Sequence, residues 1–164
     1  MSNKPGLGIV VMSLLAVTAV PVRDVAATAT ATLGVSATVQ SACTASASSL
    51  RFGTYTGSIV NANSTISVRC THLTPYNVGL SEGLAPGATV ANRKMIGPGL
   101  ALLGYTLRPG SGGIPNWGHT IGVDTVSGIG NGSLQTLAVL GQIPAGQDVE
   151  DGAYADTITV TVSY

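Results

Sequence analysis

The feature that most constrains this chain is a strict alternation of small polar and apolar residues over residues 28–39, TATATLGVSATV. Its apolar positions are Ala29, Ala31, Leu33, Val35, Ala37 and Val39. A period of two is typical of a strand with one buried face. Twelve extended residues reach about 40 Å, which is longer than most strands, so we expect part of this segment to extend beyond its own domain. The alternation leaves open where the extension ends, and Gly34 is one plausible break.

The rest of the chain reads as short strands separated by Gly- and Pro-containing turns, with no helical periodicity after residue 27. Strands are predicted at residues 39–45, 64–71, 76–81, 100–107, 135–142 and 155–164. Gly128–Gly132 is interpreted as a hairpin loop. This pattern predicts an all-β protein with an immunoglobulin-like antiparallel β-sandwich.

The C-terminal stretch TITVTVSY alternates again, and the sequence stops on its last apolar residue. An immunoglobulin-type sandwich closes with a further strand at this edge. We therefore expect an incomplete sandwich that lacks its last strand, with an unpaired edge and an open apolar groove. The residues expected to line one wall of that groove are Ile158, Val160, Val162 and Tyr164.

The first 27 residues are interpreted as an export signal, with a basic start at Lys4, an apolar run over residues 7–20 and small residues before the cleavage point. Cleavage is expected after Ala27, with Ala29 as the alternative. The apolar run is too short for a spanning helix, so no stable membrane insertion is expected. The predicted organisation is a signal peptide at residues 1–27, an N-terminal extension at 28–39 and one domain at 40–164.

The charge of the chain bears on nucleic-acid binding, and its cysteines bear on disulfide formation. Without Lys4, Arg23 and Asp24, the seven basic and seven acidic residues become five and six. The basic residues are scattered, which disfavours nucleic-acid binding. The two cysteines, Cys43 and Cys70, lie in an exported chain, where disulfides persist, so we expect them to be bonded.

Nothing in the sequence predicts an enzyme, a cofactor or a metal site. His72 and His119 have no activating context, and a single Cys-x-His pair at Cys70 lacks the ligands of a structural zinc site. The acidic residues Asp148, Glu150 and Asp151 do not have EF-hand spacing and are interpreted as a solvated loop. Trp117 is interpreted as a packing anchor.

Several motifs, in this order and spacing, resemble one known family. They are the start ATATLGVSATVQSAC, then LRFGTY at residues 50–55, NSTISVRC at 63–70, TPYNVGL at 74–80, NWGHT at 116–120, DTVSG at 124–128, GQIPAGQ at 141–147 and the end GAYADTITVTVSY. Across nearly the whole mature chain the sequence resembles the spore coat protein U domain family, which includes Csu-type subunits of archaic chaperone–usher pili.

The resemblance implies donor-strand complementation, in which the N-terminal extension of one subunit completes the sandwich of a neighbour. The partners it implies are other pilus subunits, a periplasmic chaperone and an outer-membrane usher. It places the protein in a surface fimbrium reached through the periplasm, with roles in attachment and biofilm formation. Two alternatives remain open: a self-completed secreted coat or matrix protein, and a carbohydrate-binding adhesin module.

Overall fold

The computed structural model of the protein describes residues 26–164. Most of the predicted signal peptide lies outside these residues. Thr38–Tyr164 form one compact unit. Residues 26–42 form no strand and are exposed; Leu33, Val35 and Val39 have 87%, 87% and 88% of their surface accessible. The alternating apolar face of the extension is therefore uncovered.

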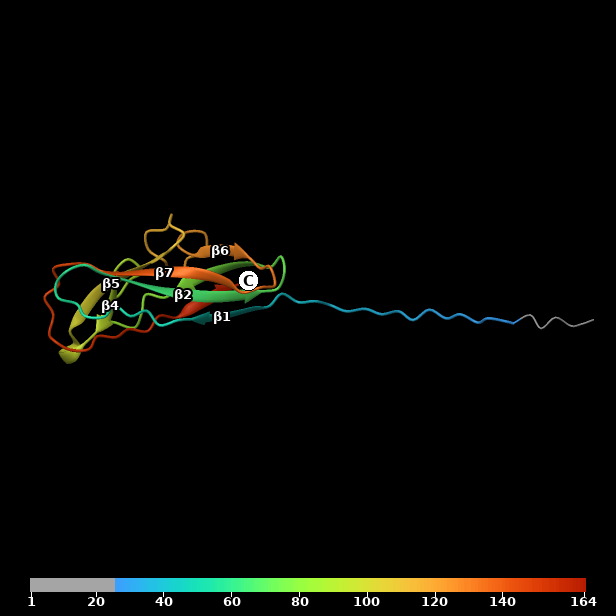
Figure 1. Cartoon of the computed structure of the whole chain (residues 1–164), viewed down its shortest axis with the longest axis horizontal. Helices are drawn as coiled ribbons and strands as arrows, with labels where there is room; N and C mark the ends of the chain where they lie inside the picture. The colour runs from blue at the N-terminus through green and yellow to red at the C-terminus, as the bar shows by residue number, and fades with distance from the viewer. Residues whose placement is uncertain (1–25) are drawn as a thin grey trace, which may run out of the picture. The chain divides into compact units, whose positions relative to one another are not determined.

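The larger of two antiparallel sheets has five strands, in the order β1-β2-β7-β5-β4 (Figure 1). Its strands are β1 (Cys43–Ala47), β2 (Val60–Cys70), β4 (Arg93–Ile96), β5 (Leu102–Pro109) and β7 (Gln135–Ile143). The β2–β7 ladder is the longest and pairs Val60 with Ile143 at one end and Val68 with Gln135 at the other. β1 continues the sheet from β2 and is one of its edges.

The smaller sheet has three strands in the order β6-β3-β8, namely β3 (Pro75–Leu80), β6 (Val126–Ile129) and β8 (Val160–Ser163). A single 3-10 turn, Pro98–Leu100, is the one helical element within residues 26–164. The chain is thus all-β, with the two-sheet antiparallel architecture of the immunoglobulin-like sandwich predicted from its sequence.

The core lies between the two sheets because each long strand turns every second residue inward. β2 contributes Ile66, Val68 and Cys70, which are at most 2% exposed, and β3 contributes Val78 and Leu80. Trp117 is fully buried and its indole Nε1 donates a hydrogen bond to the Val78 carbonyl oxygen at 2.8 Å. Its predicted role as a packing anchor is confirmed.

Several predicted boundaries and loops are wrong. The first domain strand begins at Cys43 rather than Val39, and the last one covers Val160–Ser163 rather than residues 155–164. Two strands of four residues, β4 and β6, were not predicted. β6 also takes in Gly128 and Ile129, which the sequence assigned to a loop. Four residues contain at most two inward positions, too few for an alternation to stand out.

The predicted Cys43–Cys70 disulfide is present. The two residues face each other directly in the β1–β2 ladder. The bond therefore attaches the first residue of β1 to the last residue of β2.

Arg93 is the most unexpected core residue, because its side chain is fully buried. Its guanidinium donates to the carbonyl oxygens of Ser81 (2.9 Å), Val90 (2.9 Å), Leu80 (3.2 Å) and Trp117 (2.6 Å). Burial lowers the pKa of Arg93 from its ordinary value. The side chain thereby connects β4 to the end of β3 and to the Trp117 segment.

Tyr105 of β5 is also buried, and its hydroxyl donates to Asp156 Oδ2 at 2.7 Å. Asp156 Oδ1 accepts from the backbone N–H groups of Leu84 and Thr157 at 2.8 Å each. Burial, and then the hydrogen bond to Asp156, raise the pKa of Tyr105 far above its usual range. This pair attaches the segment before β8 to the larger sheet.

We expect Arg93→Leu to lower the free energy of unfolding by about 3–5 kcal/mol, because two buried and two partly buried carbonyl oxygens lose their donor. The measurement is urea unfolding followed by circular dichroism. Arg69→Leu is the matched control, since Arg69 is exposed and donates to one carbonyl, that of Gly132. Equal losses in the two variants would contradict the bridging role of Arg93.

The raised pKa of Tyr105 predicts a loss of stability in alkali. A phenol whose pKa is raised by folding stabilises the fold fully below its unfolded pKa, about 10, and this contribution is lost as pH rises toward the folded pKa. The free energy of unfolding should fall by about 1.4 kcal/mol per pH unit above pH 10 for each such group. Burial also raises the pKa of Tyr76, so Tyr105→Phe should reduce this slope without abolishing it. A slope unchanged by Tyr105→Phe, measured against Tyr164→Phe, would refute the assignment.

Candidate strand-acceptor groove

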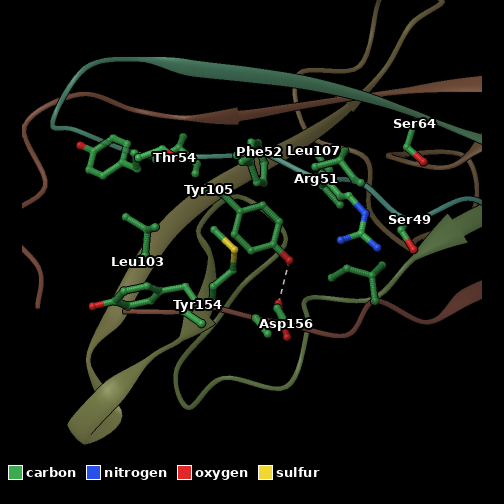
Figure 2. Close-up of a pocket in the computed structure, with 18 of the residues that line it drawn as sticks. Ser49, Arg51, Phe52, Thr54, Ser64, Leu103, Tyr105, Leu107, Tyr154 and Asp156 are labelled. Carbon is green, nitrogen blue, oxygen red and sulfur yellow. Dashed lines mark hydrogen bonds between the residues drawn. The ribbon is translucent and has the colours of Figure 1, made fainter. Parts of the chain in front are cut away.

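A groove of about 1160 Å³ opens on one side of the domain (Figure 2). It lies over the sandwich core between two segments that have almost no strand pairing. We call residues 48–57 the first wall and residues 146–158 the second wall. Figure 2 shows Thr54 and Leu103 toward one end of the groove and Ser49 and Ser64 toward the other.

The floor of the groove is apolar and is built by both sheets. β5 contributes three alternate residues, Leu103, Tyr105 and Leu107. The remaining floor residues are Ile66, Leu80, Met95, Val139 and Ile143. These side chains belong to the core cluster, so the groove is a place where the core is incompletely covered.

The first wall begins where the β1–β2 ladder ends. After Ala47, the Ser48 N–H still donates to the Thr65 carbonyl oxygen at 2.9 Å, and the chain then leaves the sheet edge. Phe52 and Leu50 pack over β7, because a Cβ built at Gly141 would lie 2.8 Å from Phe52 Cζ and 2.9 Å from Leu50 Cδ1. The Phe52 ring meets Tyr105 edge to face, with centroids 5.8 Å apart. The first wall therefore rests on the core through a few side chains.

The second wall leads into β8, which is an edge strand. The wall is attached by the Ile96–Ala155 bridge and by Asp156. β8 pairs with β3 alone among residues 26–164, from Leu80–Val160 to Asn77–Ser163. β1 of the larger sheet approaches β8, and Val160 of β8 lines the groove. Unpaired backbone groups beside an apolar floor are the requirements for adding a strand.

The four residues predicted to line the groove lie in different environments in the structure. Ile158 and Val160 line the groove and are half-buried. Val162 packs against the core and pairs with Val78, but does not line the cavity. Tyr164 is 62% exposed and is also absent from the lining. The predicted donor residues, from Ala29 to Val39, lie in the exposed extension, and their role stays a prediction.

Charged groups occupy the rim of the groove rather than its floor. In Figure 2 the guanidinium of Arg51, from the first wall, points toward the cavity near Ser49. The second wall carries Asp148, Glu150 and Asp151, all exposed. Within residues 26–164 no three His, Cys, Asp or Glu side chains gather as metal ligands. His72 and His119 are exposed, and His119 lies 3.9 Å from Glu82.

Of the residues predicted for the groove, Ile158 and Val160 line it, and most of the other lining residues were missed. The first wall contains the LRFGTY motif, but its residues do not alternate strictly and gave no structural signal. The floor residues on β5 and β7 fall within predicted strands, so their alternation could have identified them. Asp156 could not be found, because a carboxylate that binds backbone N–H groups has no distinctive sequence pattern.

In the described part of the chain, no helix has the length and apolar character needed to cross a membrane.

The chain is similar to a known protein in sequence and to a solved structure in fold. The chain is 34% identical to Protein U of Myxococcus xanthus over 156 residues, covering 85% of this chain and 87% of that protein. It also resembles the crystal structure of the CsuC–CsuE chaperone–tip adhesion subunit pre-assembly complex from the archaic chaperone–usher Csu pili of Acinetobacter baumannii. That match has a TM-score of 0.59 and 28% identity, and covers 77% of this chain. This chain spans 41% of the length of the matched chain.

The sequence pattern of the Spore Coat Protein U domain matches residues 29–161. This match includes both the alternating extension and the groove. The chain therefore belongs to the Spore Coat Protein U domain family.

Proposed function

We propose that this chain is a structural subunit of a chaperone–usher pilus, which polymerises when the N-terminal extension of one copy enters the groove of another. The observation that carries the proposal is the groove itself, with an apolar floor beside the unpaired edge of β8. The similarity to a structure of chaperone–usher pilus components supports the same function.

The extension has the properties that the groove requires of an occupant. Its apolar residues are Ala29, Ala31, Leu33, Val35, Ala37 and Val39, and its longest side chain, Leu33, is 87% exposed. Burying one Leu and two Val contributes about 1.5–3 kcal/mol each. The other three apolar side chains are Ala, so backbone hydrogen bonds, at about 0.5–1.5 kcal/mol each, carry a larger share of the affinity.

Insertion into a second copy is favoured over folding back into the same copy. Ala42 is held on both sides by Thr71, because its N–H donates to Thr71 Oγ1 at 3.2 Å and its carbonyl oxygen accepts from the Thr71 N–H at 2.9 Å. A return to the same groove beside β1 would require the chain to reverse over residues 39–41, Val-Gln-Ser. Those residues include none of the Gly, Asn or Asp that tight hairpins prefer.

In this proposal a periplasmic chaperone covers the groove until assembly, and an outer-membrane usher carries out the exchange. The product is a surface fimbrium that serves attachment and biofilm formation. The role is structural rather than catalytic, since the groove presents an apolar floor and backbone edges rather than a set of reacting groups.

Leu33→Asp should abolish polymers, because a carboxylate cannot enter the apolar groove. The loss of Leu burial alone corresponds to at least about a tenfold decrease in affinity. The measurement is the ladder of polymers in unboiled samples after co-expression with the chaperone. Thr32→Asp, on the opposite face of the extension, is the matched control and should retain the ladder. An undiminished ladder from Leu33→Asp would favour a self-completed monomer.

Mixing two defective copies provides a reciprocal test. Leu33→Asp leaves the groove intact, whereas Ile158→Asp places a charge in the groove and leaves the extension intact. Each variant alone should stay monomeric, and the mixture should give dimers and no longer species on size-exclusion chromatography. Dimers would form because one competent groove meets one competent extension. Long polymers from either variant alone, or monomers in the mixture, would argue against insertion between copies.

A further inference from the structure

The alternation of the extension does not by itself fix which of its residues occupy the groove. A slip of one residue would turn the polar face inward, but a slip of two residues keeps every apolar side chain on the same face. Residues 28–39 repeat small polar and small apolar residues almost uniformly. If the proposed function holds, the groove must contain something that selects one register.

The part of the groove floor that β5 supplies is shorter than the extension. It runs from Leu103 to Leu107, a separation of about 13 Å at 3.3 Å per residue. The twelve residues of the extension reach about 40 Å when extended. Several segments of the extension could therefore lie over the same floor.

One end of the groove is closed by hydrogen bonds between its walls. The Tyr55 hydroxyl, from the first wall, accepts from the Gln147 N–H at 2.9 Å and donates to the Pro144 carbonyl oxygen at 3.0 Å. The Gly146 N–H of the second wall donates to the Gly57 carbonyl oxygen at 2.9 Å. Among the hydrogen bonds of residues 26–164, the Gln147–Tyr55 and Gly146–Gly57 bonds alone connect the two walls, and the Tyr55–Pro144 bond attaches the first wall to the segment just before the second.

Gln147 fixes this closed end to the floor as well. Its Oε1 accepts from the Gly104 N–H at 2.7 Å, and its Nε2 donates to the Gly104 carbonyl oxygen at 2.9 Å. The carboxamide thus forms two hydrogen bonds with one β5 residue, as a neighbouring strand would. A Cβ built on Gly104 would lie 2.9 Å from Gln147 Oε1. The close approach of the carboxamide therefore depends on a residue without a side chain at this position. We call Tyr55, Gly104, Pro144 and Gln147 the latch.

The opposite end has no such closure. In Figure 2, Ser49 and Ser64 lie there, away from Thr54 and Leu103. Ser64 Oγ donates to the Ser48 carbonyl oxygen at 2.6 Å, which attaches the first wall to β2 and not to the second wall. The groove is therefore asymmetric, with its walls joined at the latch and separate at the other end.

We propose that the latch is the register stop of the groove: it limits how far an inserted strand can advance and so selects one of the registers that alternation alone leaves equivalent. Tyr55 and Gln147 act as positioning residues, because they hold the walls together rather than supplying the apolar floor.

Disulfide trapping between neighbouring copies measures the register. Full-length chains carry Thr157→Cys on the second wall, where residue 157 is exposed. They also carry one cysteine on the polar face of the extension, at Thr28, Thr30, Thr32, Gly34, Ser36 or Thr38 in turn. Disulfides require Cα atoms within about 7 Å, and a two-residue slip moves the strand by about 6.6 Å, so each register favours a different position. Covalent dimers are quantified after boiling polymers without reductant.

With the native latch, we expect one cysteine position to exceed every other by about tenfold, a ratio that corresponds to about 1.4 kcal/mol. Tyr55→Phe, and separately Gln147→Met, should spread the dimers over positions two residues apart, within about threefold of one another. Tyr154→Phe is the matched control, because it removes a tyrosine hydrogen bond to the Glu150 carbonyl oxygen within the second wall and leaves the walls joined. Thermal unfolding verifies that each variant is folded.

Two results would overturn the register stop: dimers spread over several positions with the native latch, or a single position retained in both latch variants. The absence of dimers at every position with the native latch would instead contradict strand insertion itself, and the latch proposal with it. Spreading in Tyr154→Phe as well would show that loosening the second wall is sufficient, and would also reject the latch as the selecting element.

Discussion

The rest of this structure depends on one requirement: backbone groups at the edge of a sheet need partners, and within residues 26–164 β8 has a strand partner on one side only. The core beneath that edge is built as in any sandwich, with inward side chains from both sheets. Its cover is missing where the two walls stand apart. An apolar floor beside an unpaired edge has the features that the addition of a strand requires.

Side-chain hydrogen bonds, rather than additional buried apolar surface, hold the open core in shape. Arg93 binds four carbonyl oxygens at the end of β3, in the turn before β4 and at Trp117. Asp156 receives the Tyr105 hydroxyl and two backbone N–H groups in front of β8. Tyr105 and Asp156 line the groove, whereas Arg93 lies outside its lining. A preformed groove loses less conformational entropy when a strand enters it.

Sequence periodicity predicted the parts of the fold in which burial alternates along a strand. β2, β3, β5 and β7 were found within a few residues, because each has at least three inward positions. The four-residue strands β4 and β6 were missed, as was the place where β1 begins. For the groove, Ile158 and Val160 followed from alternation, whereas Tyr55, Gln147 and Arg93 did not. These residues act by hydrogen bonds to backbone atoms that are distant in sequence, and no local pattern encodes such contacts.

The position of the disulfide has a mechanical consequence. The extension joins the domain at Cys43, which is the first residue of β1 and is bonded covalently to Cys70 at the end of β2. Tension applied along the extension therefore passes through the sulfur bridge into β2, whose ladder with β7 is the longest in the protein. The five residues of β1 therefore need not transmit that tension through their hydrogen bonds alone. Within each unit of a fibre, traction on the extension would therefore enter the domain at a covalent bridge.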